Sequence, residues 1–232
     1  MNFVIGSDPI MKTITLNCTV NRSNDELADE LRGRLSRSGT LFINVMSAAG
    51  SGKTTLLSRI ITDMRGVKFG VMEADIASDV DAVKMEAIGA KALQVNTSGM
   101  CHMDAGMTQA AFDALDGAYD SDIVFLENVG NLICPAEYDT GAHINLMLLS
   151  VPEGDDKPLK YPLMFGKSDI LVITKTDALP YFDFDVEKCS RRAKALNPEL
   201  KIFPVSAKTG DGMPELCEYL DNLLNSLKGI EL

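Results

Sequence analysis

Apolar residues recur along this chain in seven short runs of strand length. The runs cover residues 40–46, 68–74, 91–97, 122–129, 144–151, 169–175 and 201–207. Between most of them lie stretches whose apolar residues are three or four positions apart, the spacing of an amphipathic helix. These stretches cover residues 23–36, 54–64, 79–88, 104–115, 186–196 and 214–227. Continuous apolar strands that alternate with helices predict a mainly parallel sheet covered by helices on both faces, an α/β fold.

The first predicted helix has clear local signals. Leu27, Leu31 and Leu35 lie four residues apart, and Ser23 with Glu26 has the spacing of a capping box. Ahead of this helix, residues 11–20 ("MKTITLNCTV") predict an additional edge strand. The chain has no internal repeat, low-complexity tract or evident linker. We therefore expect one domain over residues 1–232, with an N-terminal strand and helix extension of about 1–38 and a main body of 40–227.

Composition and charge exclude several classes of protein. No apolar run approaches the roughly 18 residues that a transmembrane helix needs, and the first residues do not have the pattern of a signal peptide. The net charge is −11 and the pI near 4.6, so nucleic acid and anionic membrane are unexpected partners. Five cysteines, an odd number at wide spacing, argue against a disulfide framework. We expect a reduced, cytoplasmic protein.

One strand-to-helix junction carries a phosphate-binding pattern. The general motif is G-x-x-x-x-G-K-[ST], and this chain has Ser47 in place of the first glycine. Lys53 would reach the β- and γ-phosphates, and the Thr54 hydroxyl would ligate Mg²⁺. A glycine-rich turn without a ligand is the alternative. The predicted nucleotide-binding residues of this loop are Gly50, Ser51, Gly52, Lys53, Thr54 and Thr55.

The last two predicted strands end in segments that resemble guanine-recognition motifs. "ITKTD" (173–177) and "VSAKTG" (205–210) stand where GTPases carry N-K-x-D and S-A-K. Asp177 would accept hydrogen bonds from guanine, and adenine would leave that carboxylate unpaired. Thr174 replaces the usual asparagine. The predicted base-binding residues are Lys175, Asp177, Ser206, Ala207 and Lys208, so we expect GTP and GDP as ligands.

Two cysteines and a histidine form a candidate metal site. Cys101 and His102 are neighbours, and Cys134 follows the next predicted strand. Two thiolates and an imidazole suit Zn²⁺ or Ni²⁺. Three ligands do not close a structural site, so the metal would exchange with solvent or be completed by a second subunit. A Cys-His pair with a purely structural role is the alternative.

Four long segments give the chain a specific resemblance. They read "NTSGMCHMDAGM" (96–107), "FLENVGNLICPAEYDTG" (125–141), "LLSVPEGDDKPLKYPLMF" (148–165) and "LPYFDFD" (179–185). Together they resemble the hydrogenase-maturation GTPases that deliver nickel, the HypB family, over residues of about 15–227. Members of that family also have a serine at the position of Ser47. The resemblance implies a P-loop NTPase of the signal-recognition and nickel-chaperone class, which forms a homodimer when GTP is bound.

The resemblance also implies roles for individual residues. By motif match, Cys101, His102 and Cys134 would hold Ni²⁺ or Zn²⁺ at the dimer interface. Asp75 would lie near Mg²⁺ or the attacking water, and Glu127 would start a switch-like turn that ends at Gly130. Both carboxylates could instead be ordinary strand-end residues. The implied partners are a small nickel chaperone and a hydrogenase large-subunit precursor.

The distribution of arginine bears on the rate of hydrolysis. Residues 66–190 contain no arginine, so a cation that this central region adds to the transition state would be a lysine. Lys157 is the better candidate and Lys160 the second. Without an arginine finger we expect slow turnover, on the order of 10⁻⁴ to 10⁻² s⁻¹. A solvated surface lysine is the alternative for Lys157.

Three other functions compete with nickel delivery by this family. A urease-type nickel GTPase fits less well because its Cys-Pro-His order is absent. A metal-binding module with a vestigial nucleotide site disagrees with the intact Lys53, Thr54 and Asp177. A regulatory G protein with a structural zinc would keep its metal when nucleotide binds. His143 is expected to be structural, and Cys189 and Cys217 fall on apolar helix positions.

Overall fold

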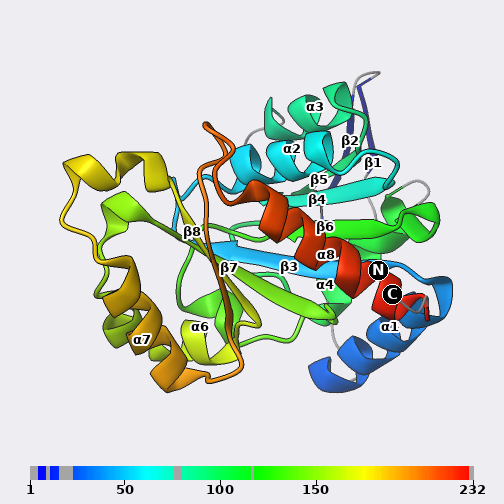
Figure 1. Cartoon of the computed structure of the whole chain (residues 1–232). Coiled ribbons are helices and arrows are strands. Elements are labelled where there is room, and N and C mark those ends of the chain that lie inside the picture. The colour runs from blue at the N-terminus through cyan, green and yellow to red at the C-terminus, as the bar shows by residue number, and fades with distance from the viewer. Residues whose placement is uncertain (1–4, 9–10, 16–22, 76–79, 116–117, 230–232) are drawn as a thin grey trace.

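A nine-stranded sheet forms the centre of the molecule, with the order β1-β2-β5-β4-β6-β3-β7-β8-β9 (Figure 1). The computed structural model describes residues 5–8, 11–15, 23–75, 80–115 and 118–229. Every neighbouring pair in this sheet is parallel except β1 and β2. The strands are β1 (Ile5–Asp8), β2 (Met11–Thr15), β3 (Leu41–Ser47), β4 (Phe69–Asp75), β5 (Lys91–Asn96), β6 (Ile123–Glu127), β7 (Ile144–Ser150), β8 (Ile170–Thr174) and β9 (Lys201–Pro204).

Helices connect the parallel strands and cover both faces of the sheet. The α-helices are α1 (Asn24–Ser38), α2 (Lys53–Asp63), α3 (Val80–Ala87), α4 (Ala105–Ala114), α5 (Lys157–Lys160), α6 (Pro162–Lys167), α7 (Val186–Leu196) and α8 (Met213–Leu227). Short 3₁₀ helices are η1 (Ala118–Asp120), η2 (Cys134–Ala136), η3 (Val151–Glu153) and η4 (Thr176–Tyr181). Figure 1 shows α8 crossing in front of the sheet, on the side where α2 and α3 also lie. No helix within the described ranges is long and apolar enough to cross a membrane.

Strand β3 shows why the predicted strands read as continuous apolar runs. Its Leu41, Ile43 and Val45 pack with α2 and α8 on one face, whereas Phe42 packs with α1 and α4 on the other. Successive side chains of a strand point to opposite faces, so a strand buried on both sides needs apolar residues at every position. All seven residues of β3 are buried. The remaining core lies between β7, β8 and helices α6 and α7.

Helix α1 begins and ends at residues with clear physical reasons. The Ser23 hydroxyl accepts a hydrogen bond from the Glu26 amide, as the capping pattern predicts. Gly39 ends the helix in the left-handed conformation, at φ 70°. The buried residues Ala28, Leu31 and Leu35 form the face that packs on the sheet. The helix is therefore firmly docked on the domain.

The predicted α/β fold is confirmed, with two differences at the periphery. The seven predicted parallel strands are present as β3 to β9. Residues 11–15 form β2, but β1 is the edge strand, and residues 16–20 of that predicted strand lie outside the described residues. The short helices α5 and α6 after β7 were not predicted, because the prolines at their starts interrupt the apolar periodicity.

Candidate functional site

A cavity of about 580 Å³ opens where β3, β4 and β6 end. Its lining comes from four segments: residues 49–55 without Ser51, residues 73–74, residues 127–130, and Lys175. In parallel α/β sheets, ligands bind outside the carboxyl ends of the strands. The cavity therefore lies where the sequence predicts the nucleotide.

The phosphate loop and the first residues of α2 form one part of the cavity lining. Gly50 and Gly52 adopt left-handed conformations, at φ 76° and 96°, which let the backbone turn tightly into α2. Gly52 caps α2 without a side-chain hydrogen bond, so the first amides of the helix stay available to an anion. Lys53 Nζ donates to Ser47 Oγ over 3.3 Å, and Ser47 Oγ donates to the Ala48 carbonyl over 2.7 Å. The serine that replaces the usual glycine thus holds the phosphate-loop lysine.

The carboxylate of Glu153, which is not among the predicted site residues, fixes the conformation of the phosphate loop. Ser51 Oγ lies 2.7 Å from Glu153 Oε1 and 2.9 Å from the Ala48 carbonyl. The same oxygen of Glu153 accepts hydrogen bonds from the Ser150 amide and hydroxyl, over 2.9 and 2.8 Å. The phosphate loop is thereby tied to η3, which precedes Lys157. The Ser-x-x-Glu spacing of a capping box at Ser150 was the available signal.

Thr54 and the end of β6 form a corner rich in oxygen ligands. Thr54 Oγ1 donates to Glu127 Oε1 over 3.0 Å. Glu73 on β4 is the cross-strand partner of Glu127, is buried, and lines the same cavity. Asp75 is the last residue of β4, and its side chain lies outside the described part of the structure. A hydroxyl and two carboxylates are hard oxygen ligands that fit Mg²⁺.

Sequence reasoning missed Glu73, although a signal for it existed. Its carboxylate interrupts the otherwise apolar run "KFGVMEA", two positions before Asp75. Alternate residues of a strand face the same side, so Glu73 could have been placed with the other candidate carboxylates.

The segments after β8 and β9 meet at the predicted guanine site. Ser206 Oγ donates to Asp177 Oδ1 over 2.8 Å, which orients this carboxylate. Lys208 lies with Nζ 3.9 Å from Asp177 Oδ2 and is largely exposed. The Ala207 carbonyl accepts a hydrogen bond from Arg59 of α2. The two predicted base-binding segments are therefore adjacent.

Thr174 and Lys175 connect the guanine site to the phosphate loop. Thr174 Oγ1 donates to the Ser51 carbonyl over 2.8 Å in a buried position. Lys175 adopts a left-handed conformation at φ 60°, and its Nζ donates to the Gly50 carbonyl over 2.7 Å. Threonine in place of the usual asparagine therefore still fixes the end of β8 to the loop.

Lys157 is not among the lining residues of the nucleotide cavity. It begins α5, and its Nζ lies 5.4 Å from the centre of the Tyr161 ring. Lys160 forms an ion pair with Asp156. Neither lysine therefore reaches the cavity of its own chain in this arrangement.

The candidate metal ligands lie on two neighbouring loops. Cys101 Sγ lies 3.7 Å from His102 Nδ1, and Cys134 is the neighbour that most influences the pKa of Cys101. The His102 ring stacks on Tyr138, with 3.8 Å between centroids and 8° between planes. Cys134 Sγ also accepts a hydrogen bond from the Asn131 side chain over 3.4 Å. The two loops thus contact each other through the stacked rings, and their thiols influence each other electrostatically.

The protonation of these groups has clear physical causes. The hydrogen bond with Cys134 and then desolvation raise the pKa of the exposed Cys101 thiol. Desolvation lowers the pKa of His102, so its imidazole is neutral near pH 7, the form that binds a metal. Within the ranges that the structure describes, no group of three or more His, Cys, Asp or Glu side chains is arranged to hold an ion. The candidate ligands are gathered in pairs rather than closed around one point.

The remaining polar candidates have structural roles. His143 Nδ1 accepts a hydrogen bond from the Phe42 amide, and Nε2 lies 3.0 Å from Ser36 Oγ, which joins α1 to β3. Burial raises the pKa of Cys189 to about 12 and that of Cys217 to about 11. Cys189 is fully buried and Cys217 packs against the core, so both thiols stay protonated near neutral pH and have structural roles.

Comparison with known proteins places this geometry in a family. The profile described as "CobW/HypB/UreG, nucleotide-binding domain" matches residues 41–204. The hydrogenase maturation factor HypB of Azotobacter chroococcum is 45% identical over 199 residues, 85% of this chain and 65% of that protein. The HypB of Escherichia coli is 43% identical over 199 residues, 85% of this chain and 68% of that protein. The chain thus spans about two thirds of the length of these relatives.

Solved structures are similar along most of the chain. A crystal structure of HypB from Helicobacter pylori in complex with nickel has a TM-score of 0.83 and 40% identity, and covers 88% of this chain and 95% of that one. HypB from Archaeoglobus fulgidus has a TM-score of 0.81 and 39% identity, over 87% of this chain and 98% of that one. The signal recognition particle 54 kDa protein from Aeropyrum pernix shares the fold alone, with a TM-score of 0.52 and 15% identity over 79% of this chain and 46% of that one.

Proposed function

The chain belongs to the HypB hydrogenase maturation factors, and from this premise we propose that it is a GTP-hydrolysing metallochaperone for nickel–iron hydrogenase maturation. It couples nucleotide-dependent dimerisation to nickel delivery. One observation carries the proposal: the turn that follows Glu127 contacts the phosphate loop and continues directly to Cys134. An added Cβ at Gly130 would lie 3.0 Å from backbone atoms of Ala49. A γ-phosphate that shifts this turn also shifts a metal ligand.

Hydrolysis uses the groups around the cavity. Lys53 and the loop amides bind and orient the phosphates, and Asp177 with Lys175, Lys208, Ser206 and Ala207 selects guanine. Thr54 with Asp75 and Glu127 would hold Mg²⁺, and the bound ion would supply positive charge that neutralises the phosphates. The carboxylate of Glu127 or Asp75 orients the attacking water. Turnover is slow because residues 66–190 offer no arginine.

Dimerisation completes what one chain lacks. Lys157 lies outside its own cavity, and we assign it to the nucleotide of a second copy. Cys101, His102 and Cys134 from each copy meet across the same interface and hold Ni²⁺ or Zn²⁺. The gathering of these ligands in pairs supports a shared site, since a tetrahedral metal site needs ligands that converge. Nucleotide and metal are then linked reciprocally.

Nickel is the cargo that this proposal favours. The solved HypB of Helicobacter pylori binds nickel, and two thiolates with an imidazole suit that ion. A small nickel chaperone supplies it, and a hydrogenase large-subunit precursor receives it. The four described cysteines are free, which supports the reducing cytoplasm as the compartment. Residues 1–232 act as a single GTPase domain, with 1–38 as the extension and 40–227 as the G domain.

A urease precursor is the second candidate recipient. A relative from Helicobacter pylori, 42% identical over 200 residues, is named a hydrogenase/urease maturation factor. Delivery of nickel to both recipients separates this candidate from a hydrogenase-specific factor.

Nickel and zinc affinities test the proposal. We would measure them by competition with a chromophoric chelator, with GDP and with a non-hydrolysable GTP analogue, and follow oligomeric state by light scattering. For Cys101→Ala we expect a loss of nickel affinity of at least ~10-fold, since a direct ligand is worth no less than its supporting groups. Cys217→Ala is the matched control, because this half-buried thiol belongs to α8 and not to either ligand loop.

Two outcomes decide between the functions. Nickel binding that depends on nucleotide and on Cys101, with a dimer only in the GTP state, supports metal delivery. Metal binding that ignores both nucleotide and Cys101 would leave a regulatory GTPase with an unrelated structural metal.

A further inference from the structure

Helix α1 contacts both loops that carry the candidate metal ligands. Its first residue, Asn24, accepts a hydrogen bond at Oδ1 from the Ala105 amide over 2.9 Å. Its Nδ2 donates to the Asp139 carbonyl over 2.9 Å. Ala105 follows His102 by three residues, and Asp139 follows Cys134 by five. One side chain therefore joins the Cys101–His102 loop to the Cys134 loop.

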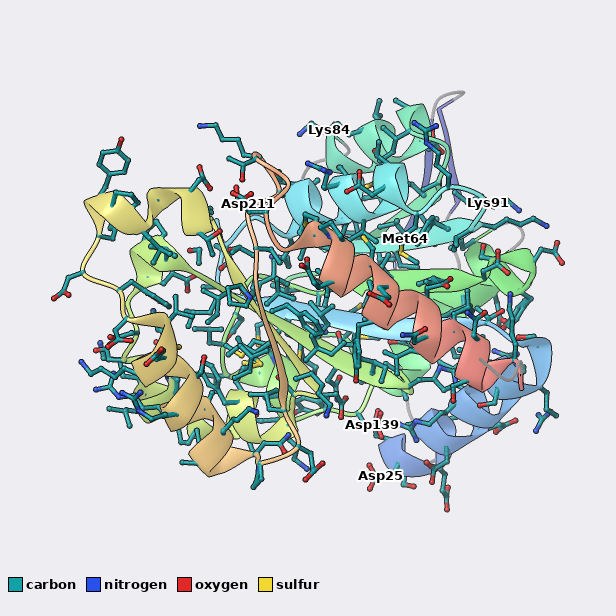
Figure 2. The ribbon with its side chains drawn as sticks, viewed as in Figure 1. Asp25, Met64, Lys84, Lys91, Asp139 and Asp211 are labelled. Atoms are coloured by element: carbon teal, nitrogen blue, oxygen red, sulfur yellow. The ribbon has the colours of Figure 1, made fainter. Side chains whose placement is uncertain are left out.

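The segment that Asn24 binds is itself fixed to α1. Arg32 donates to both carboxylate oxygens of Asp139, over 2.8 and 2.7 Å, and to the Ala142 carbonyl over 3.0 Å. Gly141, at φ 80°, approaches α1 so closely that an added Cβ would lie 3.0 Å from Leu31 Cδ2. Figure 2 shows Asp139 beside the end of α1 that carries Asp25. Helix α1 thus anchors this loop through hydrogen bonds and close packing.

The bridge also sets the ring contact at His102. Tyr138 precedes Asp139, and its ring stacks on His102 from the opposite loop. A shift of Asp139 relative to Ala105 would therefore move the Tyr138 ring along the imidazole and separate Cys101 from Cys134. The amide side chain of Asn24 supplies the donor and the acceptor that the two loops need.

We propose that Asn24 is a positioning residue of the metal half-site: its amide fixes the spacing of the two ligand loops, from a helix outside the matched nucleotide-binding domain. Helix α1 ends at Ser38, whereas the family profile begins at residue 41. The inference rests on the proposed metal function of Cys101, His102 and Cys134. The competing interpretation is that Asn24 only satisfies an amide at the start of α4.

Two substitutions test whether Asn24 joins the two ligand loops or only satisfies an amide at the start of α4. Asn24→Ala removes both hydrogen bonds. Asn24→Asp keeps the acceptor for the Ala105 amide and places a negative charge at two helix N-termini, where it is favourable, but it loses the donor to Asp139. Asp25→Ala is the matched control, since Asp25 is an exposed neighbour in the same first turn.

The readouts are nickel affinity, the thiolate-to-nickel charge-transfer bands, and capture by phenylarsine oxide, a trivalent arsenical that bridges two nearby thiols. A bridge predicts that Asn24→Ala and Asn24→Asp each lose about 10-fold in nickel affinity, as second-shell changes do. Both variants should also capture the arsenical less well than Asp25→Ala. GDP affinity should stay at the wild-type value, which a general loosening of the fold would not allow.

Three results would overturn the inference. These are an Asn24→Asp protein that binds nickel and arsenical like wild type, an Asn24→Ala protein that does so, and an Asp25→Ala protein that loses as much as either. Failure of the proposed function looks different. Wild-type protein would then bind no nickel, while arsenical capture would still report the spacing of Cys101 and Cys134.

Discussion

The nucleotide cavity and the metal half-site meet at one edge of the sheet but are held together in different ways. Side chains around the cavity bond to the phosphate loop itself: Ser47 holds Lys53, Glu153 holds Ser51, and Thr174 bonds its carbonyl. The candidate metal ligands contact each other in pairs, and their loops are anchored from α1. One chain therefore forms the whole candidate anion site, whereas the candidate metal ligands depend on supports elsewhere in the chain.

The difference implies that the two sites can be damaged separately. Supports of the cavity come from β7, β8 and the phosphate loop, and supports of the half-site come from α1. The turn at residues 128–130 is the connection between them. Substitutions on either side of that turn should therefore impair one site and spare the other.

The largest effect is expected on the nucleotide side, for Lys53→Ala. Removal of the cation that faces the phosphates should lower GTP turnover by about 10²-fold or more. Nickel affinity without nucleotide should remain at the wild-type value. Single-turnover hydrolysis and chelator competition measure the two quantities, with Lys194→Ala, an exposed lysine on α7, as the control. A parallel loss of nickel affinity would contradict the separation of the sites.

A smaller effect is expected on the metal side, for Gly141→Ala. The left-handed backbone costs about 1–2 kcal/mol for a residue with a Cβ. That Cβ would also press on Leu31 and on the Ala28 carbonyl, 3.0 and 3.1 Å away. Denaturant unfolding should show lower stability, and nickel affinity should fall while GDP affinity does not.

Gly89→Ala is the control that measures the cost of the left-handed backbone alone, without a contact on α1. Gly89 has φ 94°, and no atom of the described residues lies within 4 Å of an added Cβ. Gly89→Ala should lower the free energy of unfolding without changing the affinity for nickel. Equal nickel affinity in the two variants would show that the packing of α1 on this loop has no influence on the half-site.

The smallest effect is expected for Thr174→Val, which removes one support of the phosphate loop. Loss of the hydroxyl leaves the buried Ser51 carbonyl without this donor, at a cost of about 1 kcal/mol. GDP affinity, measured by calorimetry, should fall by up to ~5-fold, and Thr174→Ser should restore it. A serine variant as weak as the valine variant would assign the effect to the lost methyl group instead.

Local sequence signals predicted the sheet and the phosphate loop but not the connections between distant segments. The apolar runs and the loop motif are local, so β3 to β9 and the position of Lys53 could be identified. Asn24 lies 81 residues from Ala105 and 115 from Asp139, and no local pattern reports such contacts. Thr174 could be recognised as a departure from the usual asparagine, but its bond to Ser51 needed the fold.

The placement of α1 ahead of residue 41 has a consequence for the design of truncated and chimeric forms of this protein. A boundary drawn at the start of the matched domain would retain the segments that we assign to phosphate and guanine. It would discard Asn24 and Arg32, and would uncover Phe42 in the core. The two proposed activities therefore need different minimal lengths of polypeptide. Exchanging only the N-terminal helix between relatives would transfer the support of one site without altering a residue of the other.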